Sequence, residues 1–483
     1  MLMGWFWTIP LMRPNLPQWF GVSTKTKNSA SGLATKRVKL RGDTRGSATV
    51  ATSPRFLKNY YDERRSLPCK LWARNHSDGN NRFGKIRDAW RVCVSEMTAK
   101  EPKAQAKKII GLFPGLLGVG GIQEAGRLTA AALKKISLRE DDWSAYFQSL
   151  SDPPGAHEFV AAESKICLRG FGRSKMRFVL SAVRHCRQGA RVVLAAHPHL
   201  ALPAAAAKWF SPQLKTIVMS HGVEVWKPLP WLRRQALLSA DVVLAPSSDT
   251  AQRLAKIQGV PQSKIRKLAW PLNPDFLRLA DVRTELPLPK EFPGGRVILT
   301  VGRWAASERY KGADDLIRSM VQLRMKFPGL YLVAVGEGDD LSRLKKIAVD
   351  ASVSESVRFL TGLSRQEIAA CYARCEIFAF PSTGEGFGLV FLEAMAFGKA
   401  LVGAACGGTT DVVEDNVNGL LVPARDSERL AAALAALLQD ELLRTKLGRH
   451  GAEIVRRNYS FEVFQSKLEL ILEECGLDSH RQG

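Results

Sequence analysis

The sequence predicts an α/β protein made of two doubly wound domains that face each other across a cleft. Short apolar runs alternate with helix-like stretches over most of the chain, which is typical of parallel sheets covered by helices on both faces. The alternation occurs in two series, separated by the proline-rich residues 271–293. In each series glycines follow the first apolar run, and folds of this kind bind ligands beyond the carboxyl ends of their strands.

The first series starts with an apolar run at residues 109–113. Glycines at residues 118–121 and an alanine-rich stretch to about residue 135 follow it. This order predicts a strand, a glycine loop and a helix, and the first domain is predicted to span residues 106–280. Further strands are expected at residues 191–196, 215–220 and 241–245, and helices at residues 173–187, 202–210, 231–239 and 250–258.

The second series predicts a domain of the same kind over residues 281–460, which we expect to bind the ligand. A last helix within residues 461–483 is predicted to pack back toward the first domain. Strands are expected at residues 297–301, 331–335, 357–360, 376–380, 400–402 and 419–422, and helices at about 313–326, 339–348, 365–372, 389–397 and 427–438.

The net charge of +24 is concentrated at one end of the chain. Residues 1–108 contain 22 Lys and Arg against 7 Asp and Glu, without a sustained helix or strand period. We interpret residues 1–105 as a poorly ordered extension, either a dispensable tail or a misassigned start, in preference to a basic segment that adsorbs to surfaces. Because the remaining chain is only mildly basic, no nucleic-acid partner is expected.

Composition limits the class of protein further. Hydrophobic residues make up 46% of the 483 and charged residues 24%, which excludes a wholly disordered or collagen-like chain. The early apolar stretch is interrupted by Pro10, Pro14 and Pro17, so we interpret it as neither a signal peptide nor a membrane span. The eight cysteines form no disulfide or zinc pattern, and a cytoplasmic location is expected.

Two basic residues follow the first strand of the second series. Arg303 comes directly after Gly302 at the strand end, and Lys311 stands eight positions later, before a helix. A guanidinium and an ammonium that converge at one strand end suit a diphosphate, since each charge-assisted bond contributes about 1.5–3 kcal/mol. The alternative is a pair of solvated surface bases.

The most informative motif is a glycine-rich turn between a buried strand and an apolar helix. Glu385 lies in the turn, followed by Gly386, Phe387 and Gly388, and Glu393 lies in the helix. Glycines let the backbone approach a ligand, and the start of a helix favours an anion. Carboxylates only accept hydrogen bonds, so the two glutamates suit hydroxyl groups on either side of a phosphate site. The turn therefore predicts a nucleotide sugar as the ligand.

The glutamates eight positions apart around Gly-Phe-Gly, together with the Gly-Arg…Lys-Gly element, resemble the retaining glycosyltransferases of family 4, which have the GT-B fold. The resemblance covers about residues 107–475. It implies that Glu385 is catalytic and contacts the transferred sugar, and that Glu393 binds the ribose. It also implies that Arg303 and Lys311 hold the diphosphate, and we expect all four side chains to share one cavity.

The resemblance assigns roles to residues elsewhere. Gly120 and Gly121 resemble the phosphate-side loop of the first domain, and His221 is expected to contact the donor sugar as a second catalytic residue. Thr361 and Gly362 end a strand where the family binds the base through backbone groups. Each assignment has a structural alternative: an ordinary turn for the glycines and for the strand end, and a hydrogen-bonded structural residue for the histidine.

His197 and His199 follow the preceding strand and are candidates for the acceptor side, with no third ligand spaced for zinc. No Asp-x-Asp pair occurs in the chain. We therefore expect no metal and no cofactor, because fixed positive charge can stabilise a leaving diphosphate in place of a metal ion.

The expected function is transfer of a sugar, with retention of configuration, from a nucleoside-diphosphate sugar to a saccharide or lipid-linked acceptor, such as a growing surface polysaccharide. A peripheral position at the inner membrane face is an option. One alternative is a sugar-nucleotide epimerase of the same fold. Another, from a different class, is a basic protein that binds nucleic acid or a membrane surface.

Overall fold

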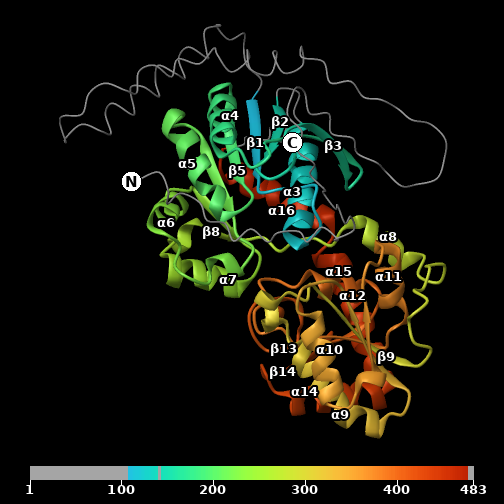
Figure 1. The fold of residues 1–483 in the computed structure, drawn as a ribbon. Helices are drawn as coiled ribbons and strands as arrows, with labels where there is room; N and C mark the ends of the chain where they lie inside the picture. Colours follow the sequence, from blue (N-terminus) through green and yellow to red (C-terminus); the bar gives the residue numbers. More distant parts are fainter. Residues whose placement is uncertain (1–106, 140–142, 477–483) are drawn as a thin grey trace, which may run out of the picture. The chain divides into compact units, whose positions relative to one another are not determined.

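The computed structural model describes residues 107–139 and 143–476, which contain two sheets and their helices (Figure 1). These residues all belong to one compact unit of the chain. The predicted extension over residues 1–105 lies outside the described residues. The prediction of two α/β halves is confirmed.

The first sheet has eight strands within the described residues, in the order β3-β4-β2-β1-β5-β6-β7-β8. Its neighbouring strands pair in parallel, except that β3 and β4 form an antiparallel hairpin at one edge. The strands are β1 Lys107–Phe113, β2 Trp143–Ser149, β3 Gly155–Ala161, β4 Ser164–Gly170, β5 Ala190–Ala195, β6 Lys215–Met219, β7 Val242–Ala245 and β8 Ile265–Lys267.

The sequence predicted β1, β5, β6 and β7 and missed the other four strands. In β3 and β4 about every second side chain is exposed to solvent, because this hairpin forms the edge of the sheet. Charged side chains such as Glu158 and Lys165, which form an ion pair across the hairpin, occupy these exposed positions. An edge strand of this kind has no continuous apolar run to mark it.

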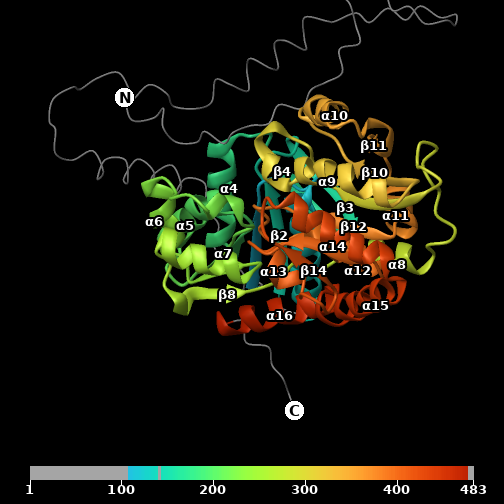
Figure 2. The ribbon, with the colours of Figure 1, turned by 90° about the horizontal axis from the view of Figure 1, so that it is seen from below.

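Helices cover the first sheet on both faces (Figures 1 and 2). The predicted helix at 250–258 is split, because a short α-helix passes into a π-helical turn that ends at Gly259, with φ 74°. The predicted linker contains an additional helix, α8. The helices are α3 Gly121–Ser137, α4 Lys175–Arg187, α5 Ala201–Phe210, α6 Trp231–Leu238, α7 Ser248–Arg253 and α8 Pro274–Asp281, with short turns η1 Pro198–Leu200, η2 Val223–Val225, η3 Leu254–Gln258 and η4 Gln262–Lys264.

The second sheet is entirely parallel within the described residues and has the order β11-β10-β9-β12-β13-β14. All six of these strands were predicted, because their continuous apolar runs are buried between two helical layers. They are β9 Arg296–Val301, β10 Leu330–Val335, β11 Val357–Leu360, β12 Ile377–Phe380, β13 Ala400–Ala404 and β14 Gly419–Val422.

The helices that follow β9 complete the second half of the fold. Two of them, α13 and α15, were not among the predicted helices. They are α9 Ala313–Lys326, α10 Leu341–Asp350, α11 Arg365–Arg374, α12 Leu389–Ala396, α13 Thr409–Val412, α14 Ser427–Gln439, α15 Glu441–Asn458 and α16 Phe461–Glu474, with the 3-10 turns η5 Ala306–Lys311 and η6 Ser354–Ser356.

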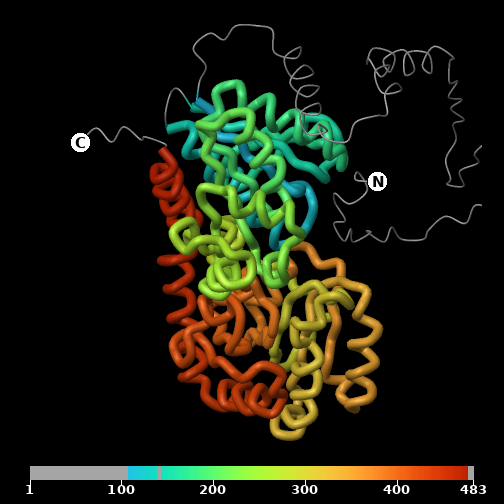
Figure 3. The backbone as a smooth tube through the Cα atoms, turned by 90° about the vertical axis from the view of Figure 1, so that its left-hand side faces the viewer, coloured from blue at the N-terminus to red at the C-terminus, as the bar shows by residue number. Residues whose placement is uncertain are grey.

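The last helix, α16, packs against α3 of the first half (Figure 3). Phe461 at its start is buried and lies under the ammonium of Lys135, 5.0 Å from its ring centroid. Farther along, Glu469 forms an ion pair with Arg139. The C-terminal helix thereby joins the second half of the chain to the helical layer of the first.

Candidate functional site

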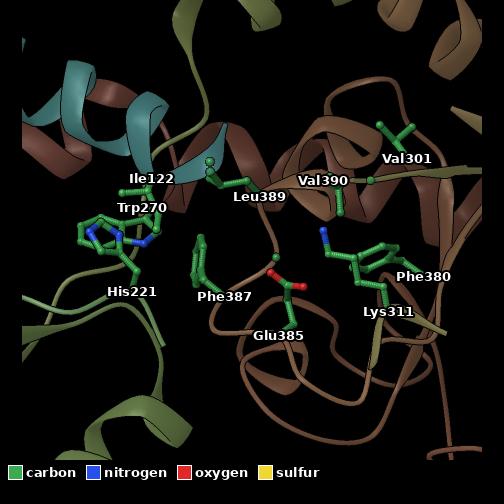
Figure 4. Close-up of a pocket in the computed structure, with 13 residues that line it drawn as sticks. Ile122, His221, Trp270, Val301, Lys311, Phe380, Glu385, Phe387, Leu389 and Val390 are labelled. Carbon is green, nitrogen blue, oxygen red and sulfur yellow. The ribbon is translucent and has the colours of Figure 1, made fainter. Parts of the chain in front are cut away.

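A pocket lies where the carboxyl ends of strands from both sheets meet (Figure 4). Its volume is about 170 Å³. Pockets that enclose a whole ligand measure roughly 300–1,000 Å³, so this one accommodates one end of a longer ligand. It is lined by Gly121, Ile122, His221 and Trp270 from the first half, and by Val301, Gly302, Lys311, Phe380, Glu385, Phe387, Gly388, Leu389 and Val390 from the second.

Two helices begin at this pocket. α3 starts at Gly121 and α12 at Leu389, and both residues line the cavity. The N-cap positions are Gly120 and Gly388, with φ of 147° and 98°, and neither end has a side-chain cap. First-turn amide groups without a side-chain cap, together with the positive ends of two helix dipoles, favour an anion in the pocket.

The turn between β12 and α12 carries Glu385 into the pocket. Phe378 and Phe380 at the end of the strand contact Phe391 of the helix, with ring centroids 5.7 and 5.9 Å apart. This aromatic packing holds both ends of the turn, and the carboxylate of Glu385 points into the cavity (Figure 4). Burial raises the pKa of Glu385, and the positive charge of Lys311 opposes the rise.

Gly386 allows the two halves of the fold to touch at this turn. A Cβ atom on Gly386 would lie 2.0 Å from the carbonyl oxygen of His221, and one on Gly222 would lie 2.4 Å from the Cα of Gly386. The carbonyl of Gly386 also accepts a hydrogen bond of 2.7 Å from the hydroxyl of Ser247. The approach of the two backbones therefore depends on glycine at both positions.

Lys311 lies opposite, at the end of η5, with its ammonium in the pocket (Figure 4). Burial lowers the pKa of Lys311 to about 8; Glu385 opposes this fall, and the charge of Arg303 adds to it. The Nζ atom of Lys311 lies 2.7 Å from the carboxylate of Glu308, which favours the charged form of the lysine further.

Glu308 was not singled out in the sequence, although it joins the two predicted diphosphate ligands. Its carboxylate is buried and forms ion pairs with both Lys311 and Arg303. One carboxylate thus holds two cations close together. The only signal in the sequence was an acidic residue three positions before Lys311.

His221 follows β6 and lines the other side of the pocket. Its Nε2 atom lies 2.8 Å from the carbonyl oxygen of Ala196, which can only accept, so Nε2 carries a hydrogen and donates it. In the neutral ring Nδ1 is then an acceptor. The carboxylate of Glu224 accepts from the backbone amides of His221 and Gly222 and stabilises this loop.

The expectation that four side chains share one cavity is met only by Glu385 and Lys311. Arg303 does not line the pocket; its guanidinium pairs with Glu308. Glu393 does not line the pocket; it lies three positions after Val390 on α12 and accepts a hydrogen bond of 2.8 Å from the hydroxyl of Tyr372. Burial raises the pKa of Glu393 to about 7, which the Tyr372 hydrogen bond opposes.

Some of the remaining predicted site residues line the pocket, and others lie outside it. Phe387, Gly388 and Gly121 line the pocket, next to Gly386 and Gly120, which do not. Thr361 and Gly362 follow β11 in an exposed turn outside the lining, with φ 68° at the glycine. Their roles in binding a donor stay predictions.

Two family models match the chain. Residues 284–454 match the family described as "Glycosyl transferases group 1", and residues 145–275 match "Glycosyltransferase Family 4". A GDP-mannose-dependent alpha-(1-6)-phosphatidylinositol monomannoside mannosyltransferase of Mycobacterium tuberculosis is 32% identical over 267 residues, which are 53% of this chain and 68% of the relative. A D-inositol 3-phosphate glycosyltransferase of Nocardia farcinica is 32% identical over 240 residues, 47% of this chain and 51% of the relative.

Solved structures share the fold. Anabaena HepE in complex with UDP superimposes with a TM-score of 0.61 at 18% identity, over 76% of this chain and all of HepE. The sucrose-phosphate synthase of Thermosynechococcus elongatus gives a TM-score of 0.59 at 22% identity, over 78% of this chain and all of the synthase.

Proposed function

The chain belongs to glycosyltransferase family 4 and has the GT-B fold, and from this we propose that it transfers a sugar from a nucleoside-diphosphate sugar to an acceptor hydroxyl, with retention of configuration. The observation that carries the proposal is the pocket that joins the ammonium of Lys311, the carboxylate of Glu385 and two helix N-termini. A cation and amide dipoles suit the diphosphate, and a carboxylate suits the sugar hydroxyls.

Within this proposal the diphosphate binds beside Lys311 and the starts of α3 and α12. Arg303 shares Glu308 with Lys311, so it is close enough to contact the same phosphates after a change of side-chain conformation. Glu393 follows Val390 by less than one helical turn, which supports a role in binding the ribose beyond the pocket.

The proposed reaction breaks the bond between the anomeric carbon and the donor phosphate oxygen, and the electron pair leaves with the diphosphate. Lys311 and the helix dipoles stabilise that charge as it develops, without a metal ion. The acceptor oxygen attacks from the same face of the sugar, and its proton passes to the leaving phosphate. Glu385 and Nδ1 of His221 accept hydrogen bonds from the sugar hydroxyls and orient the ring.

The acceptor is proposed to be a saccharide or a lipid-linked group. The mycobacterial relative is named for a phosphatidylinositol mannoside acceptor and the Nocardia relative for inositol 3-phosphate, which supports a hydroxylated acceptor with a phosphate. Among the described helices, none is both long and apolar enough to cross a bilayer. We place the enzyme in the cytoplasm, with the option of peripheral contact at the inner membrane face.

A donor screen tests the proposal. Since a ligand that binds only the folded state raises the melting temperature, UDP-, GDP- and ADP-sugars are compared by thermal shift. The stabilising donor is then used to compare Glu385→Gln with the exposed control Glu355→Gln. We expect Glu385→Gln to abolish sugar transfer and to leave nucleotide binding largely intact. Full transfer by Glu385→Gln, or conversion of the donor sugar without release of nucleoside diphosphate, would refute the proposal.

A further inference from the structure

A carboxylate of the second half binds the first half of the fold beside the turn that carries Glu385. Asp411 lies on α13, and its carboxylate accepts hydrogen bonds of 2.9 Å from the backbone amide and from the hydroxyl of Ser248, the first residue of α7. The ammonium of Lys267 lies 3.2 Å from the same carboxylate. Helix α7 lies on the side of the first half that faces the second (Figure 1). Three donors of the first half thus bind one acid of the second.

The amide and the hydroxyl of Ser248 contribute most to this contact. The side chain of Asp411 is 13% exposed, so solvent competes little for its hydrogen bonds, whereas the side chain of Lys267 is 58% exposed and its charge is screened. Hydrogen bonds to a charged acceptor are roughly twice as strong as those between neutral groups. The start of α7 is therefore held mainly by the bonds between Asp411 and Ser248.

The residue before Ser248 connects this contact to the turn. The hydroxyl of Ser247 accepts a hydrogen bond of 3.2 Å from the backbone amide of Thr250 and thereby caps α7. The same hydroxyl donates a hydrogen bond of 2.7 Å to the carbonyl of Gly386. Ser247 is completely buried, so water does not replace this bond. A shift of the start of α7 would therefore break the bond to the residue that follows Glu385.

Asp411 is also joined to the turn within its own half of the fold. Gly408, three residues before it, donates a hydrogen bond of 2.7 Å from its backbone amide to the carbonyl of Glu385. A Cβ atom on Gly408 would lie 2.3 Å from the carbonyl oxygen of Gly386, so the two segments are in close contact. Successive carbonyls of the turn are thus bound from two sides. Residues 408–411 bind the first, and the serine next to the partner of Asp411 binds the second.

We propose that Asp411 is a positioning residue for sugar transfer, and that it acts through Ser248 and Ser247 on the peptide groups that orient Glu385. This inference rests on the proposed function, in which Glu385 binds the transferred sugar. Asp411 does not line the pocket, so its effect on the sugar is exerted through these neighbours. The consequence is that Glu385 is correctly oriented only while the first half of the fold is in contact with the turn.

Two variants weaken the contact from opposite sides. Asp411→Asn keeps the shape of the side chain and one acceptor oxygen but removes the charge. Ser248→Pro removes both donors of the serine; proline fits the first position of a helix and needs an extended residue before it, which Ser247 is, with φ −140° and ψ 163°. The matched control is Asp426→Asn, because Asp426 accepts a hydrogen bond of 2.8 Å from the amide of Arg429 within the second half.

Amide hydrogen exchange reports on the turn without requiring sugar transfer. The exchange of residues 383–389 in the full chain is followed by mass spectrometry. We expect this segment to exchange about tenfold faster in Asp411→Asn and Ser248→Pro than in the wild type, because the loss of charge-assisted bonds makes local opening more frequent. Asp426→Asn should exchange there at the wild-type rate. Wild-type exchange of this segment in both variants would overturn the proposal.

A double-mutant cycle in the transfer assay tests the path through Ser247. With the donor identified by thermal shift, Asp411→Asn should lower kcat about tenfold, and Ser247→Ala should lower it as well. In the Ser247→Ala background Asp411→Asn should add little, because the contact through which it acts is already lost. Additive losses in kcat, or a lower melting temperature with kcat unchanged, would indicate a purely structural role and refute the inference.

The two measurements separate this inference from the proposed function. If the wild type transfers no sugar from any donor while hydrogen exchange responds as expected, the proposed function fails and the connection between Asp411 and the turn stands. If the wild type transfers sugar and Asp411→Asn, Ser248→Pro and the control Asp426→Asn all match it in kcat, only the positioning role fails.

Discussion

Replacing Glu308 by glutamine should move the alkaline loss of sugar transfer to a lower pH. The carboxylate of Glu308 lies 2.7 Å from Nζ of Lys311, and the lysine side chain is only 15% exposed, so solvent screens this pair little. Arg303 is 55% exposed, and its pair with the same carboxylate contributes less. The expected consequence therefore concerns the proton of Lys311.

The size of the effect follows from the charges that face Lys311. Burial, with Glu385 opposing it and Arg303 adding to it, gives a pKa of about 8. The carboxylate of Glu308 also faces Lys311, and an adjacent opposite charge moves a pKa by about one to three units toward the charged form. In Glu308→Gln this contribution is lost, so the pKa of Lys311 should fall further and the lysine should lose its proton at a lower pH than in the wild type.

The assay is kcat/KM for the donor measured from about pH 6.5 to pH 9. Wild-type activity should fall as the pH rises through about 8, in proportion to the charged fraction of Lys311. In Glu308→Gln the same fall should begin about one pH unit lower or more, because an adjacent carboxylate is lost. Glu337→Gln, an exposed change on the neighbouring strand end, serves as the control. A variant whose activity falls equally at every pH would falsify this account, because a purely structural role predicts that result.

Two further predictions concern the turn and helix that carry the glutamates. Gly386→Ala should destabilise the fold by about 1–3 kcal/mol and reduce transfer at least tenfold, because the new Cβ atom would lie 2.0 Å from the carbonyl oxygen of His221. The control Gly294→Ala should change neither stability nor transfer, because its Cβ atom would meet no other atom within 4 Å. Burial raises the pKa of Glu393 from 4.5 to about 7, so the folded state holds a proton that the unfolded state releases. Unfolding free energy should therefore fall between about pH 4.5 and 7, by at most about 3 kcal/mol, and Glu393→Gln should remove that pH dependence in denaturant titrations.

Much of the second half of the fold was predictable from local pattern. The strands of its sheet are buried on both faces, so runs such as residues 297–301 are continuously apolar and stand out in the sequence. In the first half, β3 and β4 escaped prediction because an edge hairpin alternates exposed and buried residues and carries charge. A strand that is buried on both faces is therefore easy to recognise in the sequence, whereas a strand that is buried on one face is not.

In the candidate site, too, some side-chain positions were predictable from the sequence and others were not. Glu385 and Lys311 were predictable because each follows a buried strand, and the carboxyl ends of parallel strands share one edge of the sheet. Arg303 and Glu393 follow equally clear motifs, yet their side chains contact Glu308 and Tyr372. Which partner a charged side chain takes depends on what the fold brings near it.

By itself, the sequence determined the fold class, the buried strands of the second sheet and the glycine turn that bears Glu385. Only the tertiary structure placed Gly386 against His221, put Glu308 between two cations, and aligned His197 with His221 from neighbouring strands. The physical reason is the range of the interactions. Apolar periodicity and turn glycines act over a few residues, whereas these contacts join residues whose neighbourhood is decided by how separate elements pack.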